Sequence, residues 1–234
     1  MLKVQDIHTY YGESHALQGV SIELKQGETV CLLGRNGAGK STTLKTIVGL
    51  TPARQGSVIF EGEDITKCYP YQVARKGIGL VPEDRRVFAT LTVKENLEVS
   101  RYVRPGVTPS WSVERIFDEY PMLAEIADRD ASNLSGGQQQ MLAVARSLMS
   151  EPKLLLLDEP NEGLAPVIVR QIGELIDQLK KTTTILFTDQ STHFALKHAQ
   201  RAYFLEKGRV VYAASSQELK EDQALQERYL TVDG

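Results

Sequence analysis

The feature that most constrains this chain is the stretch from Gly34 to Ser41, which reads GRNGAGKS. It matches the pattern G-x-x-x-x-G-K-[ST] of a phosphate-binding loop, also called Walker A. The apolar run over 29–33 predicts a buried strand before it, and an amphipathic helical pattern follows until Gly49. A glycine-rich loop between a strand and a helix predicts a polyphosphate site in an α/β fold.

The residue types of this loop suit a nucleotide polyphosphate. Glycines carry no Cβ, so backbone N–H groups can surround phosphate oxygens, and the start of the helix adds a partial positive charge. Lys40 brings a full charge to the β- and γ-phosphates, and Ser41 offers a hydroxyl to Mg²⁺. The residues expected to bind the nucleotide here are Gly34, Asn36, Gly37, Ala38, Gly39, Lys40, Ser41 and Thr42.

A pair of acids follows a second apolar run. Residues 154–157 are four leucines, which predict a fully buried strand, and Asp158 and Glu159 come directly after them. Ligands of open α/β sheets lie at the carboxyl ends of strands. We therefore expect Asp158 to hold Mg²⁺ through its water shell and Glu159 to face an attacking water.

Two other local features have both a functional and a structural explanation. Ser135-Gly136-Gly137 opens a helical pattern, and its N–H groups and hydroxyl suit an anion, although a serine cap explains the same residues. Tyr10 and Tyr11 precede Gly12, and one of them could stack on a purine or pack at a strand end. Taken alone, these residues leave both explanations open.

The remaining pattern predicts a small antiparallel sheet and a set of helices around the core. Alternation over 20–24 and a short strand over 57–60 indicate the antiparallel sheet. Further elements are expected as core strands at 77–81 and 184–187, a hairpin at 202–212, helices within 93–122 that Pro105 and Pro109 interrupt, a helix capped by Ser112, an amphipathic helix at 168–179, and a polar helix from 215 to about 228.

Bulk properties exclude several classes of protein. The net charge of −3 provides no overall basic footprint for nucleic acid. Cys31 and Cys68 do not suggest a disulfide framework or a metal site, which fits a reducing cytosol. The first residues lack the apolar core of a signal peptide, and no run approaches the ~18 apolar residues of a membrane span. We expect any membrane connection to come through a partner.

The motifs together resemble those of the ATP-binding cassette (ABC) ATPases. The phosphate loop, LSGGQ at 134–138 and LLLLDEP at 154–160 stand in that family's order and at its usual spacing. The resemblance covers essentially the whole chain. It implies one domain over 1–234, with a mixed, mainly parallel P-loop NTPase sheet, a small antiparallel β lobe and an inserted helical lobe over approximately 84–150. It also implies ATP and Mg²⁺ as ligands.

The resemblance further implies roles for residues that pattern alone left open. Two cassettes would pair head to tail, so that one chain's signature motif binds the partner's nucleotide in trans. Tyr11 matches the aromatic residue that stacks on adenine, and Glu159 matches the general base. The residues expected to act in trans are Ser135, Gly136, Gly137 and Gln138.

Three positions depart from the family's commonest pattern. Glu83 stands where glutamine is usual, and we expect it to join Ser41 and Asp158 as a metal ligand. Gln190 occupies the position of the switch histidine, and Ala165 that of a loop aspartate. His193 lies three residues beyond the switch, in the wrong register. Because lysine and general base are both present, we expect an active ATP hydrolase with the catalytic residues Glu159, Gln190 and Lys40.

With these departures, the sequence resembles the ATPases of branched-chain amino-acid importers. The resemblance lies in the stretches over 82–88, 135–140 and 159–166. The implied system has a second cassette, identical or a sibling, with two transmembrane permeases docked near 83–95 and an external substrate-binding protein. The chain would then lie on the cytoplasmic face of the inner (plasma) membrane as a peripheral subunit, without nucleic acid. The alternatives are a lipid or lipopolysaccharide exporter ATPase, which Glu83 and Gln190 disfavour, and a soluble non-transport ABC protein.

Overall fold

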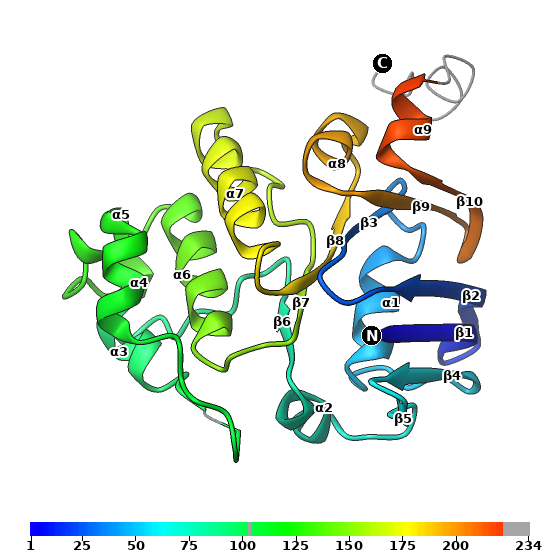
Figure 1. The fold of residues 1–234 in the computed structure, drawn as a ribbon, viewed down its shortest axis with the longest axis horizontal. Coiled ribbons are helices and arrows are strands. Elements are labelled where there is room, and N and C mark those ends of the chain that lie inside the picture. Colours follow the sequence, from blue (N-terminus) through cyan, green and yellow to red (C-terminus); the bar gives the residue numbers. More distant parts are fainter. Residues whose placement is uncertain (103, 222–234) are drawn as a thin grey trace.

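A computed structural model describes residues 1–102 and 104–221 of the chain, which form two sheets flanked by helices (Figure 1). The smaller sheet is antiparallel, in the order β2-β1-β4-β5. Its strands are β1 (Leu2–Tyr11), β2 (Ser14–Leu24), β4 (Gln55–Phe60) and β5 (Glu63–Asp64). The structure therefore confirms the predicted antiparallel sheet.

The larger sheet is mainly parallel and has the order β10-β9-β3-β8-β7-β6, with β10 antiparallel to β9. Because β3, β8 and β7 are parallel neighbours, the loops at their carboxyl ends meet at one edge. The strands are β3 (Thr29–Leu33), β6 (Ile78–Val81), β7 (Leu154–Leu157), β8 (Thr184–Asp189), β9 (Arg201–Glu206) and β10 (Arg209–Ser215). The predicted mixed, mainly parallel core is confirmed.

The buried central strands serve two hydrophobic cores at once. Successive side chains of a strand point to opposite faces of the sheet. Accordingly β3 sends Val30 and Leu32 into the core shared with the antiparallel sheet, and Cys31 and Leu33 into the other core. This explains why these strands are continuous apolar runs rather than alternating ones.

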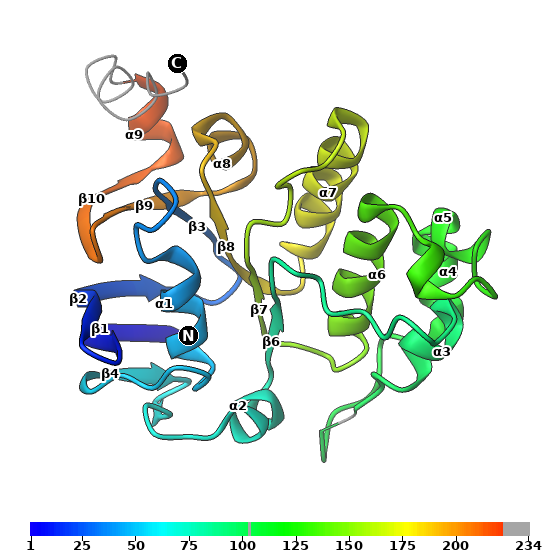
Figure 2. The same cartoon turned by 180° about the vertical axis from the view of Figure 1, so that it is seen from behind.

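Helices cover both faces of the parallel sheet. The helix α1 (Lys40–Ile47) packs between the two sheets, where Leu44 and Ile47 are fully buried and Thr46 hydrogen-bonds Thr9 of β1 at 3.0 Å. The opposite face is covered by α6 (Gly136–Leu148), α7 (Pro166–Leu179) and α8 (Thr192–His198), which share the other core (Figure 2). The smaller helix α2 (Pro70–Lys76) precedes β6.

In its described residues, the segment between β6 and α6 contains three short α-helices, α3 (Val93–Glu98), α4 (Val113–Glu119) and α5 (Pro121–Ala124), followed by a 3-10 helix over Ala131–Asn133. They lie at the end of the molecule opposite the antiparallel sheet (Figures 1 and 2). As predicted, Ser112 caps α4, its hydroxyl accepting a hydrogen bond from the Arg115 N–H at 3.1 Å. The helix α9 (Ser216–Glu221) begins the predicted C-terminal helix, whose remainder lies outside the described residues.

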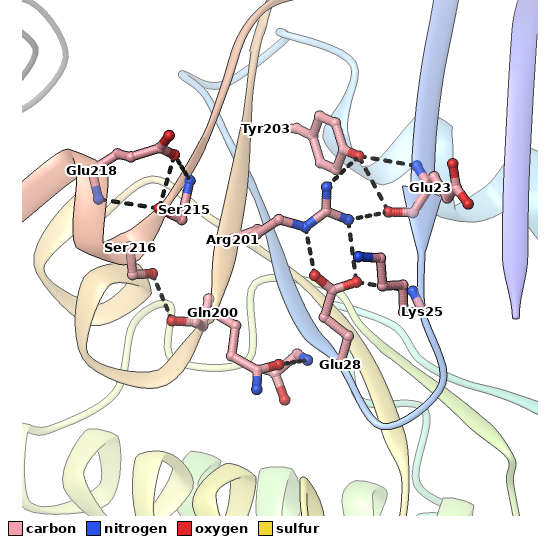
Figure 3. A network of polar contacts seen from close by, with 11 residues as sticks. Glu23, Lys25, Glu28, Gln200, Arg201, Tyr203, Ser215, Ser216 and Glu218 are labelled. Carbon is pink, nitrogen blue, oxygen red and sulfur yellow. Dashed lines mark hydrogen bonds and ion pairs between the residues drawn. The ribbon is translucent and has the colours of Figure 1, made fainter.

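A polar cluster joins the two sheets at β9, the strand between β10 and β3 (Figure 3). The Arg201 guanidinium donates to both carboxylate oxygens of Glu28, at 2.5 and 3.1 Å, and to the Glu23 carbonyl of β2 at 2.6 Å. The Tyr203 hydroxyl donates to the same carbonyl at 3.2 Å. The bidentate pair therefore fixes the turn before β3 relative to β2 and β9.

None of the helices in the described part of the chain combines the length and apolar character that crossing a membrane requires.

We predict that Arg201→Met lowers the free energy of unfolding by about 1–3 kcal/mol, because it leaves the half-buried Glu28 carboxylate without its cation. Urea unfolding measures the change. Lys3→Met is the matched control, because Lys3 forms only an exposed pair with Glu23, worth at most about 1 kcal/mol. Equal losses in the two variants would show that the Arg201 cluster adds nothing beyond an ordinary surface pair.

Candidate functional site

A cavity of about 490 Å³ opens where the phosphate loop meets the edge of the parallel sheet. One wall comes from β2, the floor from the phosphate loop and the start of α1, and the far side from three separate loops. The described residues that line it are Ser14, His15, Ala16, Gln18, Asn36, Gly37, Gly39, Lys40, Ser41, Thr42, Glu83, Glu159 and Lys207.

The phosphate loop needs its glycines for conformation and for packing. Gly39 has a φ of 110° and begins α1 in a left-handed conformation that a side chain would strain. At Gly34 an added Cβ would lie 2.5 Å from the Leu205 carbonyl oxygen, so β9 passes directly behind the loop. The turn after β9 also holds the loop, since the Gly208 N–H donates to the Ala38 carbonyl at 2.9 Å.

Lys40 is buried in this loop and paired with an acid. Its ammonium lies 2.9 Å from the Glu159 carboxylate and donates to the Gly34 carbonyl at 2.7 Å. Only 3% of the Lys40 side chain and 7% of the Glu159 side chain are exposed, so the attraction is weakly screened. Phosphate oxygens that enter the cavity would compete with Glu159 for this ammonium.

Asp158 joins the phosphate loop to two neighbouring strands. Its Oδ1 accepts hydrogen bonds from the Ser41 hydroxyl at 2.9 Å and from the Thr188 hydroxyl at 2.8 Å. Burial raises the pKa of Asp158, while these two hydrogen bonds act to lower it. The predicted meeting of Ser41 with the acid after β7 is therefore present, and Thr188 is a third member that the sequence analysis missed.

The oxygen ligands available at this site suit Mg²⁺ bound together with a nucleotide better than they suit a metal ion coordinated by protein side chains alone. Mg²⁺ in nucleotide sites takes one or two carboxylates, with water and phosphate oxygens completing its coordination. Ser41 and Asp158 supply a hydroxyl and a carboxylate, and exposed Glu83 lines the same cavity. Among the described residues, no group of three or more His, Cys, Asp or Glu side chains is arranged to hold a metal ion.

Glu159 stands in a strained conformation that other residues stabilise. Its φ is 44°, in the left-handed region, and its N–H donates to the Thr188 hydroxyl at 2.8 Å. Its Oε2 accepts a hydrogen bond from the Gln190 amide at 2.9 Å. Burial opposes ionisation, but hydrogen bonds from Glu162 and Gln190 and the pairing with Lys40 lower the pKa of Glu159.

Glu162 is a second acid beside Glu159 that the sequence analysis did not identify. Its hydrogen bond with Glu159, partial burial and the charge of Glu83 raise the pKa of Glu162 to about 7. The Gln190 amide nitrogen lies 3.5 Å from its Oε2. Glu162 can thus hold a proton at neutral pH and donate it to the Glu159 carboxylate, which limits the negative charge around the cavity.

Gln190, at the predicted switch position, is brought to Glu159. By contrast His193 is exposed on the first turn of α8 and is not among the described residues that line the cavity. The preceding acid, Asp189, is buried, accepting hydrogen bonds from the Asn161 amide at 3.0 Å and the Ser191 N–H at 2.7 Å. Its position at the carboxyl end of β8 is the signal that could have identified it.

The signature residues lie apart from this cavity. Ser135 caps α6 by accepting from the Gln138 N–H at 3.3 Å, and the Gln138 side chain accepts from the Ser135 N–H at 2.9 Å. Within one chain, Ser135 is therefore a helix N-cap, which is the structural explanation given above for this residue. Gly137 packs on Ile168, where an added Cβ would lie 2.8 Å away, and Gly136 likewise faces Arg85. Binding of a partner's nucleotide by these residues stays a prediction.

The two tyrosines before Gly12 have different surroundings. The Tyr10 ring stacks on His15 with centroids 4.1 Å apart, and the Arg54 guanidinium lies 4.4 Å from the ring centroid. Tyr10 is therefore already packed at the strand end. Tyr11 is 48% exposed, with its hydroxyl 3.5 Å from that of Thr51 beyond α1, but it is not among the described cavity-lining residues. Stacking of Tyr11 on adenine stays a prediction.

Comparisons with known proteins agree on one family. A family model described as ABC transporter matches residues 17–162. The high-affinity branched-chain amino acid transport ATP-binding protein BraG of Pseudomonas aeruginosa is 44% identical over 231 residues, covering 98% of this chain and 99% of BraG. The lipopolysaccharide export system ATP-binding protein LptB of Haemophilus influenzae is 32% identical over 234 residues, covering 98% of this chain and 97% of LptB.

A solved structure extends this similarity to three dimensions. The dimeric structure of a post-hydrolysis state of the ATP-binding cassette MJ0796, bound to ADP and Pi, superposes with a TM-score of 0.79 at 27% identity. The match covers 92% of this chain and 99% of that one.

We predict that Asp189→Asn gains stability relative to the wild type as the pH rises. Burial raises the pKa of Asp189 to about 6, from an ordinary 3.8. The native state therefore binds this proton more tightly than the unfolded state, and the wild type loses stability as pH rises through about 4 to 6. The difference in unfolding free energy should grow by about 2 kcal/mol between pH 4.5 and 7.5 in denaturant titrations. A pH-independent difference would contradict the raised pKa.

Proposed function

This chain belongs to the ABC transporter family of ATP-binding cassettes, and we propose that it is the ATP-hydrolysing motor of an importer for branched-chain or related hydrophobic amino acids. It is an ABC-type ATPase by family and fold. The observation that carries the proposal is that Lys40 and Gln190 both contact the cavity-lining Glu159, in a chain 44% identical to BraG over almost its whole length.

The proposed chemistry is transfer of the ATP γ-phosphoryl group to water. Lys40 and the loop N–H groups stabilise the charge on the phosphates, and Glu159 accepts a proton from the attacking water. Gln190 orients Glu159 and can donate its other amide hydrogen to a γ-phosphate oxygen. Ser41, Asp158 and Glu83 would hold Mg²⁺, which when bound supplies charge neutralisation at the phosphates.

We propose that a second cassette completes the site. The dimeric MJ0796 cassette bound to ADP and Pi supports pairing of two such chains. The signature residues lie outside this chain's own cavity and are exposed at Ser135, which suits action in trans. Ser135, Gly136, Gly137 and Gln138 would then face the nucleotide of the partner cassette, which is identical or a sibling.

An importer is supported more strongly than the exporter alternative. BraG is more similar to this chain than LptB is, at 44% against 32% identity over comparable lengths. The acid Glu83 at the cavity and the amide Gln190 beside Glu159 match the importer type that the sequence resembles. A soluble ABC protein outside transport is the remaining alternative, and it predicts different partners.

The proposed assembly has two permeases and an external substrate-binding protein. The chain would lie at the cytoplasmic face of the plasma membrane as a peripheral subunit, within a single domain over 1–234. The helical lobe over approximately 84–150 would contact the permeases through the loop over 83–95. In support, Phe88 in that loop is 48% exposed, with the Arg146 guanidinium over its ring at 4.3 Å.

We predict that Glu159→Gln retains or tightens ATP binding while turnover falls roughly 10²- to 10⁴-fold. A neutral amide neither accepts the water proton nor competes as a charge for Lys40. Equilibrium ATP binding and steady-state hydrolysis measure the two effects separately. Glu174→Gln, an exposed change on α7, is the matched control. Near-normal hydrolysis by the Glu159 variant would exclude it as the general base.

We predict that the tagged chain, purified from detergent-solubilised native membranes, carries two permease proteins and a second cassette. Mass spectrometry identifies them, and the genes beside the permeases point to the substrate-binding protein. Recovery of lipopolysaccharide export proteins would favour the exporter instead. Ribosomal or DNA-repair proteins without any membrane protein would overturn the transport assignment and leave the ATPase.

A further inference from the structure

The loops that follow β7 and β8 are joined by two reciprocal hydrogen bonds. The Gln190 amide of the β8 loop donates to the Glu159 carboxylate of the β7 loop at 2.9 Å. In the opposite direction, the Asn161 amide of the β7 loop donates to the carboxylate of Asp189, the last residue of β8, at 3.0 Å. Each side thus contributes one amide and one carboxylate, and only the first bond belongs to the predicted catalytic residues.

The second bond is the more deeply buried of the two. Asp189 is 3% exposed, whereas Gln190 is exposed. A buried carboxylate is costly unless hydrogen bonds satisfy it. The Asp189 carboxylate accepts from the Asn161 amide and also, at 2.7 Å, from the N–H of Ser191, which is the N-cap residue of α8. Asp189 therefore connects Asn161 to the backbone on the far side of Gln190.

We propose that Asn161 and Asp189 are positioning residues that keep Gln190 and Glu159 in register for hydrolysis, and we call this pair the clasp. The inference rests on the proposed function, in which Glu159 is the base. Gln190 can turn from Glu159 toward a γ-phosphate oxygen, since its side chain is exposed. The clasp holds the two loops at a constant separation during that exchange, because its own hydrogen bond does not involve a reacting group.

A merely structural role predicts a different result. Thr188 already ties the bases of the loops together, through the Asp158 carboxylate at 2.8 Å and the Glu159 N–H at 2.8 Å. Loss of the clasp therefore leaves the nucleotide cavity and the fold supported. The effect should appear in the rate of hydrolysis and not in the affinity for ATP, because a small misplacement of reacting groups is costly.

The test is an exchange of the two side chains. Asn161→Asp places two carboxylates face to face, and kcat for ATP should fall roughly 10- to 100-fold, with the Kd for ATP within about threefold of wild type. Asp189→Asn alone should keep most activity, because the Asn161 amide can turn and accept through its oxygen. The double variant Asn161→Asp with Asp189→Asn restores an amide–carboxylate pair, so kcat should return to within about threefold of wild type.

Two controls keep the outcomes distinct. Gln178→Glu makes the same amide-to-carboxylate change at an exposed position of α7 and should leave kcat unchanged. Asn161→Ser removes the amide without adding charge, and a lowered kcat in that variant supports the clasp even where Asn161→Asp does not fold. Denaturant unfolding of each variant checks the fold.

The clasp is overturned when Asn161→Asp and Asn161→Ser both hydrolyse ATP like Gln178→Glu, or when Asn161→Asp lowers kcat and the double variant is no better than this single one. Either result leaves the proposed function intact, as long as wild-type hydrolysis still depends on Glu159. If hydrolysis by the wild type does not depend on Glu159, then Glu159 is not the base. The premise of the clasp is lost together with that assignment.

Discussion

The site depends on a single carboxylate oxygen at which α1, β8 and the loop after β7 meet. Asp158 Oδ1 accepts one hydroxyl from Ser41, at the start of α1, and another from Thr188, at the end of β8. These groups are far apart in the sequence and meet because β3, β8 and β7 are adjacent parallel strands. This contact sets the position of the phosphate loop relative to Glu159 and Gln190. Ser41 is the last residue of the phosphate loop, Glu159 directly follows Asp158, and Gln190 comes two residues after Thr188.

Charge is the second constraint on this site. Glu83 and Glu159 line the cavity, Asp158 contacts the lining residue Ser41, Glu162 interacts with Glu159, and Asp189 is buried in the neighbouring strand. Lys40 neutralises one of these acids directly. Hydrogen bonding with Glu159 and burial raise the pKa of Glu162 to about 7, so this acid is partly neutral at physiological pH. The site therefore limits its own repulsion of phosphate by sharing protons and amide hydrogens in addition to the charge of Lys40.

Features with local causes could be predicted from the sequence. The phosphate loop, the leucine strand ending in Asp158 and the cap at Ser112 each depend on residues within a few positions of one another, and the structure has all three. Asn161, Glu162, Thr188 and Asp189 were missed because their roles depend on which two loops lie side by side. That arrangement follows from strand order, which no short pattern in one sequence encodes.

The unusual residues of this chain make physical sense as one set. A switch histidine can carry a charge, but Gln190 can only donate and accept hydrogen bonds, so it orients Glu159 without changing the charge of the site. An amide that acts through geometry alone requires a fixed separation between its loop and the loop of the proposed base, Glu159. Asn161 and Asp189 supply a second connection of the same chemical kind, one layer deeper. The loss of a titratable switch and the presence of a buried amide–carboxylate pair are therefore complementary.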